Sequence, residues 1–188
     1  MAYSNFNLIE NFKTMNLYFR FIKLLISLFF IERKPPMDES VKSFRAWPFD
    51  CDYNLHMTNA RYLSLMDLGR IHLTAQAGIL KTVYGKKWLP VVTSAELSFF
   101  KEIKPFHKFS LHSRVIAWDE KYWYIAQQFK SGDKLHATAM VRGVFVKNRK
   151  IIPFQDIVNL IDEKILAPIE PKTVTAWKAL LEAKKENS

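Results

Sequence analysis

The order of the periodic segments constrains the fold of this chain more than any other feature. Residues 59–77 alternate apolar and polar positions with a helical period, and Gly78 follows where a C-cap glycine belongs. Four segments of strand-like alternation come next, over residues 91–99, 109–117, 123–129 and 135–145. Short turns at 119–120 and 131–133 predict that the last three form an antiparallel meander. This order predicts an α+β domain in which an antiparallel sheet wraps around one long, buried helix.

The shorter segments complete this prediction. A first strand is expected over residues 41–48, and short helices near 155–165 and 173–185. Gly69 lies inside the long helix, where it costs roughly 1 kcal/mol relative to alanine, so another backbone is expected to approach closely there. We divide the chain into an N-terminal amphipathic helix and linker (1–36), a main domain (37–166) and a C-terminal helix and tail (167–188).

The N-terminal segment has an apolar stripe and an opposing polar row. The stripe consists of Leu8, Phe12, Met15, Phe19, Ile22, Ile26 and Phe29, and the row of Lys13, Asn16, Arg20, Lys23 and Ser27. It is too short, and too interrupted by Arg20 and Lys23, for a transmembrane span, and residues 29–32 offer no signal-peptidase site. Two interpretations remain open. The helix packs on the domain or across a subunit interface, or residues 8–31 make a peripheral contact with a membrane surface.

The charge balance favours an anionic partner. The 188 residues fit one medium-sized domain with appendages, and the formal net charge is +10. Nucleic acid, an acidic membrane and a small polyanionic ligand all fit that charge. No run of five or more like charges and no nucleic-acid-binding motif is present, so we expect no nucleic-acid partner.

The cysteine and histidine pattern points to no metal or cofactor. Cys51 is the single cysteine, which fits a reducing compartment, and a small filler in a polar loop is the favoured role over a nucleophile. The five histidines have no spacing typical of metal ligands.

Residues 50–62 carry the densest chemistry. Asp50, Asp52 and His56 immediately precede the long helix, whose first-turn N–H groups favour negative charge. Asp52 is suited to attack a carbonyl or to deprotonate water, with the backbone N–H of Asn59 or Ala60 as an oxyanion donor. The alternative is that the aspartates are ordinary loop-forming residues and that Thr58 or Asn59 is simply the helix cap.

Asp67 is a second acidic candidate, on the helix itself. It is solvent-facing, paired with Arg70 three residues on, or part of the lining of a site, and the sequence leaves these three open.

The run Asp52-x-x-Leu-His-Met-Thr-Asn-Ala-x-Tyr62-Leu resembles the D-x-x-G-H-V-N-N-x-x-Y-L signature of hotdog-fold acyl-CoA thioesterases of the 4-hydroxybenzoyl-CoA thioesterase-like group. Within this run, residues 55–63 (Leu-His-Met-x-Asn-Ala-Arg-Tyr-Leu) resemble the branch called thioesterase superfamily member 6-like. Residues 89–92 and 118–121 also resemble that branch. The resemblance covers roughly residues 40–150. The helix and strand order deduced above is that of a hotdog domain.

The resemblance implies a role for each matching residue. Asp52 corresponds to the catalytic aspartate, a nucleophile or general base, and Asn59 supplies a backbone N–H to the thioester carbonyl. His56 and Tyr62 match supporting positions, and Asp67 falls near the acidic residue that other hotdog branches carry on the helix. Leu55 replaces the loop glycine of the signature, which puts a side chain where close approach is usual.

These implications give an expected function. The chain would hydrolyse an acyl thioester of coenzyme A or acyl carrier protein as a homo-oligomer (dimer or tetramer), without a cofactor or metal, in the cytoplasm or at the inner face of a membrane. Two alternatives remain: a non-catalytic acyl-chain or lipid-binding hotdog protein at a membrane surface, and a weaker dehydratase interpretation. A dehydratase would need a His/acid pair on the helix, and His72 lies half a turn off the face of Asp67.

Overall fold

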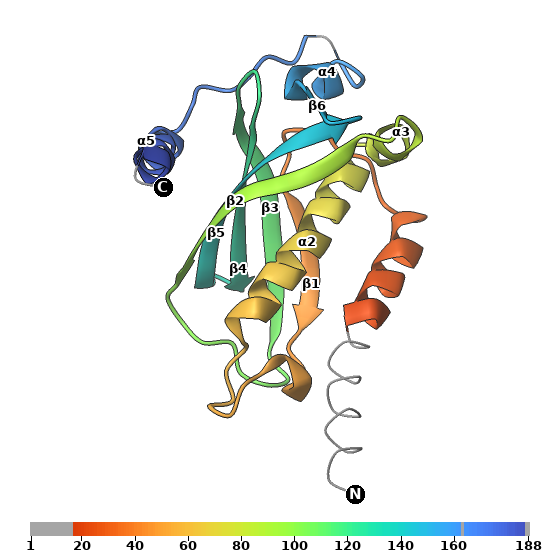
Figure 1. Cartoon of the computed structure of the whole chain (residues 1–188). Helices are drawn as coiled ribbons and strands as arrows, with labels where there is room; N and C mark the ends of the chain where they lie inside the picture. Colours follow the sequence, from red (N-terminus) through yellow and green to blue (C-terminus); the bar gives the residue numbers. More distant parts are fainter. Residues whose placement is uncertain (1–16, 163, 187–188) are drawn as a thin grey trace, which may run out of the picture.

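The computed structural model describes residues 17–162 and 164–186 (Figure 1). Within these residues one sheet of six antiparallel strands has the order β1-β3-β4-β5-β2, with β6 paired to β5. The strands are β1 (Ser40–Arg45), β2 (Leu89–Phe99), β3 (Lys108–Trp118), β4 (Trp123–Ser131), β5 (Lys134–Lys147) and β6 (Lys150–Ile152). The helices are η1 (Pro48–Asp50), α2 (Asn59–Gln76), α3 (Leu80–Gly85), α4 (Phe154–Val158) and α5 (Lys172–Glu186), with a further helix over residues 17–28.

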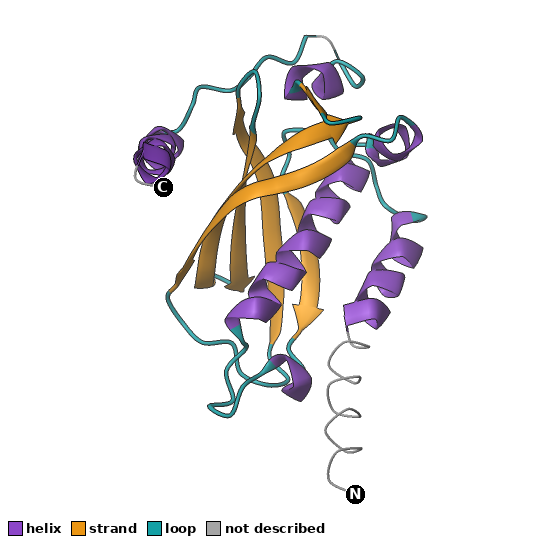
Figure 2. Ribbon diagram, viewed as in Figure 1, coloured by secondary structure: helices purple, strands orange, loops and turns teal. Residues whose placement is uncertain are grey.

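The long helix α2 lies in the hollow of the curved sheet, as Figure 2 shows. Leu65 and Met66 of α2 are fully buried in the main core. A Cβ atom on Gly69 would lie 2.6 Å from Leu111 Cδ2 and 2.8 Å from Gln127 Nε2. Gln127 also donates to the backbone carbonyl of Met66, at 3.1 Å. The glycine therefore lets side chains of the sheet approach the helix closely, where the sequence prediction expected another backbone.

The predicted α+β fold with one enclosed helix is confirmed, and most boundaries agree within two residues. Thr58 is the N-cap of α2, and Gly78 adopts a φ of 79° just after its C-terminus. β3, β4 and β5 form the predicted meander. The first strand ends at Arg45 rather than Pro48, because Pro48 begins η1. The sequence prediction also missed α3 and β6, and α4 is shorter than the helix expected near 155–165.

The N-terminal helix packs on the domain through the face opposite to the predicted apolar stripe. Leu24 is buried, and three partly buried residues of the segment pack on the same core: Leu17, Phe21 and Leu28. Arg20 and Ser27, from the predicted polar row, turn toward the domain and form hydrogen bonds there. Four stripe residues are exposed instead, namely Phe19, Ile22, Ile26 and Phe29. Leu8, Phe12, Met15, Lys13 and Asn16 lie outside the described residues.

A second, smaller apolar cluster joins the C-terminal helix to the other face of the sheet (Figure 2). Val174 and Trp177 of α5 pack there against Tyr124 of β4. Lys178 pairs with Asp119 at 3.0 Å and also with Glu170. This helix therefore covers part of the sheet surface that α2 leaves open. Among the described residues, no helix is both long and apolar enough to cross a membrane.

Candidate active site

The loop between η1 and α2 folds back on itself, so that its two ends meet just before α2 begins. Cys51 and Met57 form an antiparallel bridge at the base of the loop. Above this base, the Asp52 N–H donates to the His56 carbonyl at 2.9 Å, and below it the Thr58 N–H donates to the Asp50 carbonyl at 2.9 Å. Because Thr58 caps the helix, these bonds fix the loop against the helix N-terminus.

The Asp52 carboxylate is held by the loop backbone and faces solvent. Its Oδ1 accepts the N–H groups of Asn54 at 2.9 Å and His56 at 3.2 Å. Asn59 and Ala60, in the first turn of α2, are also exposed, and first-turn amides have no acceptor within their own helix. Asp52 is thus a loop-forming aspartate, as one of the two sequence interpretations expected. Its catalytic role stays a prediction.

Leu55, at the position of the signature's glycine, adopts a backbone conformation that glycine favours. Its φ is 59°, in the left-handed region, and its side chain points into solvent, 63% exposed. The Leu55 N–H donates to the Asp52 carbonyl at 3.0 Å, which closes the turn. Leucine therefore fits a turn of glycine-like geometry here and adds an apolar side chain at its tip.

A buried ion cluster lies directly beneath this loop, and the sequence analysis missed it. The Asp50 side chain is 0% exposed. It accepts Arg20 Nη2 at 2.5 Å, Arg61 Nε at 2.8 Å and the Trp47 N–H at 2.8 Å. Burial lowers the pKa of the Arg20 guanidinium, and the charge of Asp50 opposes that effect. The available sequence signal of burial was an aspartate that closely follows two aromatic residues, in Trp47-Pro-Phe-Asp50.

The remaining loop residues have distinct surroundings. Tyr62 is buried and meets Phe99 and Phe129 edge-on, at 5.0 and 4.8 Å between ring centroids, and burial raises its pKa to about 12. Tyr62 therefore anchors α2 in the core. His56 is exposed, so its imidazole can meet a ligand. Burial, with Asp50 and Asp52 nearby, raises the pKa of the Cys51 thiol, which keeps it protonated and supports its expected role as a filler.

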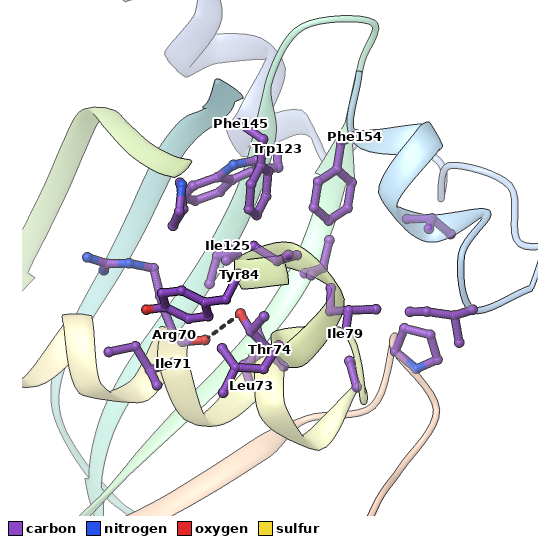
Figure 3. Close-up of a pocket in the computed structure, with 18 of the residues that line it drawn as sticks. Arg70, Ile71, Leu73, Thr74, Ile79, Tyr84, Trp123, Ile125, Phe145 and Phe154 are labelled. Carbon is purple, nitrogen blue, oxygen red and sulfur yellow. Dashed lines mark hydrogen bonds between the residues drawn. The ribbon is translucent and has the colours of Figure 1, made fainter. Parts of the chain in front are cut away.

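A mainly apolar pocket opens along the second half of α2 (Figure 3). Its volume is about 280 Å³, near the lower end of the roughly 300–1,000 Å³ typical of small-molecule sites. Aromatic side chains from the sheet and α4 form one wall, and α2 and α3 form the other. The residues labelled in Figure 3 are Arg70, Ile71, Leu73, Thr74, Ile79, Tyr84, Trp123, Ile125, Phe145 and Phe154.

Asp67 belongs to this pocket rather than to the Asp52 loop. Asp67 pairs with Arg70, one of the alternatives that the sequence left open, and both line the pocket. Its side chain is 65% exposed. Asp67 lies eight residues beyond Asn59, or about 12 Å along the helix axis. The structure thus holds Asp52 and His56 in one loop, which leads into α2 at Asn59, and places Asp67 two turns further along the helix. Within the described residues, no group of three or more His, Cys, Asp or Glu side chains is arranged to hold a metal ion.

The enclosed helix, the curled sheet and the acidic loop at the helix start define a hotdog-fold domain of the thioesterase type. Comparison with protein families gives the same answer, since residues 46–166 match the model of the thioesterase-like superfamily. The chain belongs to that superfamily.

Individual relatives agree with this assignment. The chain is 35% identical over 127 residues to the probable thioesterase YBR096W of Saccharomyces cerevisiae, covering 64% of this chain and 55% of that protein. It is 24% identical over 132 residues to protein THEM6 of Xenopus laevis, covering 69% and 62%. The chain therefore spans less than two thirds of these relatives. A structure of SAV2348 from Staphylococcus aureus in complex with CoA superposes with a TM-score of 0.60 at 13% identity, covering 73% of this chain and 92% of that one.

Proposed function

We propose that this protein hydrolyses an acyl thioester of coenzyme A, with Asp52 as its catalytic carboxylate. The observation that carries the proposal is the geometry of Asp52, whose Oδ1 accepts two loop N–H groups in the short loop that leads directly into the exposed first turn of α2. A thioester carbonyl placed over that turn would find N–H donors for its developing negative charge. The relatives named as thioesterases, and the CoA bound to SAV2348, support the choice of substrate class.

The proposed reaction needs only water and the groups of this site. In the general-base form, Asp52 takes a proton from water and the new hydroxide bonds to the thioester carbon. The C–S bond then breaks, the sulfur leaves as thiolate and takes up the proton, and the carboxylic acid and free thiol result. In the nucleophilic form, Asp52 bonds to the thioester carbon, the C–S bond breaks and the sulfur leaves as thiolate, which takes up a proton from water. Water then cleaves the resulting anhydride, which releases the carboxylic acid and restores the Asp52 carboxylate. His56, four residues after Asp52, is proposed as a supporting side chain of the site. The negative phosphates of coenzyme A suit the chain's net charge of +10.

The test is thiol release from acyl-CoAs of graded chain length, measured together with acyl-CoA binding by calorimetry. We expect hydrolysis by the wild type and a loss of about 10²–10⁴-fold in Asp52→Asn, with binding retained. Asp133→Asn, in the turn between β4 and β5, is the matched control and should match the wild type. Binding without hydrolysis in the wild type would instead support the second candidate, a non-catalytic acyl-binding protein.

We propose that two copies pair through β2 to complete the site. β2 is an edge strand of the sheet and bears exposed apolar side chains, among them Leu89, Val91 and Phe99. A long apolar edge strand pairs readily with another strand, and a second copy supplies an identical one. Asp52 is exposed in the single chain, so a partner surface would enclose the space above it.

We also propose that the exposed face of the N-terminal helical segment rests on an anionic membrane surface. Tyr18, Phe19, Phe29 and Phe30 gather large apolar side chains on it, and the last two are 87% and 86% exposed. No acidic residue occurs between Glu10 and Glu32, and Lys23 is exposed on the same helix. An apolar, aromatic face with cations at its border is typical of interfacial helices. Such a surface is also where long acyl chains accumulate.

Vesicle flotation tests this contact. Phe29→Ser/Phe30→Ser should lose binding to vesicles that contain phosphatidylserine, and the wild type should bind phosphatidylcholine vesicles less well. Leu166→Ser/Ile169→Ser, which alters two similarly exposed apolar residues elsewhere, is the control. Equal flotation of the two double variants would contradict the proposal.

A further inference from the structure

The buried Asp50 carboxylate joins three separate segments of the chain. Arg20 comes from the N-terminal helix, Asp50 from η1, and Arg61 from the first turn of α2. Arg20 Nη2 also donates to the Arg45 carbonyl at the end of β1, at 2.8 Å. The side chains of Arg20 and Arg61 are each only 11% exposed. The cluster therefore sits between the appended helix and the main domain and touches both.

This cluster is directly connected to the loop that carries Asp52. Asp50 lies two residues before Asp52, and its carbonyl accepts the Thr58 N–H at the base of the loop. Its carboxylate holds Arg61, and Thr58 and Arg61 are part of the turn that begins α2. A shift of Asp50 would therefore move both ends of the loop at once.

Stability alone gives no reason for this arrangement. Buried ion pairs are often replaced by apolar side chains without loss, because removing charges from water offsets their mutual attraction. Leu17, Phe21, Leu24 and Leu28 already attach the N-terminal helix to the core through apolar contacts. Arg20 in addition bonds to the buried Asp50 carboxylate at the base of the loop. Because a planar guanidinium forms hydrogen bonds in fixed directions, this contact fixes the orientation of Asp50.

We infer that Arg20 is a positioning residue for Asp52, acting through Asp50, so that the N-terminal helix forms part of the scaffold of the active site. The inference rests on the proposed function for its kinetic consequence and on the ion cluster for its structural one. Displacing Arg20 loosens the hold on Asp50, the loop over residues 51–58 opens more often, and Asp52 spends less time beside the first turn of α2. Small misplacements of this kind reduce turnover more than substrate binding.

Arg20→Met tests the inference, because it keeps most of the side-chain length and removes the charge. We expect kcat for acyl-CoA to fall about 10–100-fold with KM little changed, and backbone amides of residues 51–58 to exchange hydrogen faster. Arg20→Lys keeps the positive charge and should retain more of kcat than Arg20→Met does. If Arg20→Met fails to fold, Arg20→Lys takes its place in the comparison with the wild type. Lys184→Met, which removes an exposed cation from α5, is the control and should leave both readouts unchanged.

A double-variant cycle decides whether the effect passes through Asp50. If it does, adding Arg20→Met to Asp50→Asn should change loop exchange and kcat much less than Arg20→Met does alone. Additive losses, or unchanged loop exchange in Arg20→Met, would overturn the inference. A wild type without hydrolytic activity would overturn the proposed function instead, and hydrogen exchange would then decide the role of Arg20 on its own.

Discussion

At Leu55 the backbone adopts a conformation that its own side chain makes costly. A φ of 59° costs a residue with a Cβ atom about 1–2 kcal/mol, and glycine adopts it without that cost. The Leu55 side chain recovers little of this by packing, because most of it faces solvent. The loop thus adopts a glycine-like turn although leucine stands at the glycine position of the signature.

Leu55→Gly is therefore expected to stabilise the protein. The relief of backbone strain exceeds the extra entropy that glycine loses on folding, which leaves a gain of about 0.5–1 kcal/mol in the free energy of unfolding. Urea denaturation measures it. Leu55→Ala keeps the Cβ atom and should show no gain. A loss of stability in Leu55→Gly would mean that the exposed leucine has a contact that offsets the strain.

Gly69 differs from Leu55, because its neighbours rather than its backbone conformation require a glycine there. Gly69→Ala should lower the free energy of unfolding by about 1–3 kcal/mol, since the new methyl group would overlap Leu111 and Gln127. Gly85→Ala is the matched control. Gly85 ends α3, and an added Cβ would meet nothing within 4 Å, so this variant should be neutral or slightly stabilising. Equal changes in the free energy of unfolding in the two variants would show that the side chains around Gly69 can move to accommodate a methyl group.

At the scale of elements, α2 meets β1 through a histidine that stays neutral in the folded state. His72 Nδ1 lies 2.6 Å from Ser40 Oγ. Burial lowers its pKa from 6.5 to about 4, and Lys42 and Lys34 add to the effect. Between these two pH values the unfolded chain binds the proton more readily than the folded one. Stability therefore falls as the pH is lowered from 6.5 toward 4.

The contribution of His72 to this acid sensitivity should be roughly 1–2 kcal/mol, because its ring is partly exposed and solvent screens part of the shift. Chemical denaturation at pH 7 and pH 4.5 measures it. His72→Gln should lose less stability between these pH values than the wild type does, and His56→Gln, an exposed histidine, should follow the wild type. A pH dependence unchanged in His72→Gln would refute the assignment.

The elements also show how much of the fold the sequence could predict. The main-domain elements with long, regular periods were predicted closely: α2 and the strands β2 to β5. Periodicity failed for α3 and β6, which are too short to show a period. In the N-terminal helix, periodicity identified an apolar stripe but not the face that packs on the domain. This helix is apolar on two faces, and the periodicity of a sequence does not show which of them the domain covers.

The site was predictable to the same limited extent. The local signature located Asp52 and the start of α2, since both belong to one short stretch of chain. The partners of Asp50 were not predictable, because Arg20 lies 30 residues away and pairs only in the folded molecule. The pocket is also a tertiary feature, since its lining comes from residue 36 to residue 161.

At the scale of the whole molecule, the proposed dimer places β2 of one copy beside β2 of the other. Val91→Lys introduces a charge on that edge and should weaken the dimer and reduce activity together, since in the proposed dimer the partner encloses the site. Light scattering coupled to gel filtration measures the mass. Val41→Lys is matched in exposure, 45% against 43%, and lies on β1 at the opposite edge. Loss of the dimer in Val41→Lys but not in Val91→Lys would place the interface elsewhere.

Asp52, rather than Asp67, is proposed to carry the chemistry. Asp52 lies in the loop that precedes α2, where its carboxylate is held by backbone N–H groups, and Asp67 is paired with Arg70 at the pocket. The most direct measurement is kcat/KM for one acyl-CoA in Asp52→Asn and Asp67→Asn, side by side with the wild type. We predict a loss of at least about 100-fold for Asp52→Asn and a much smaller loss for Asp67→Asn. An equal loss in both variants, or a greater one in Asp67→Asn, would contradict the account.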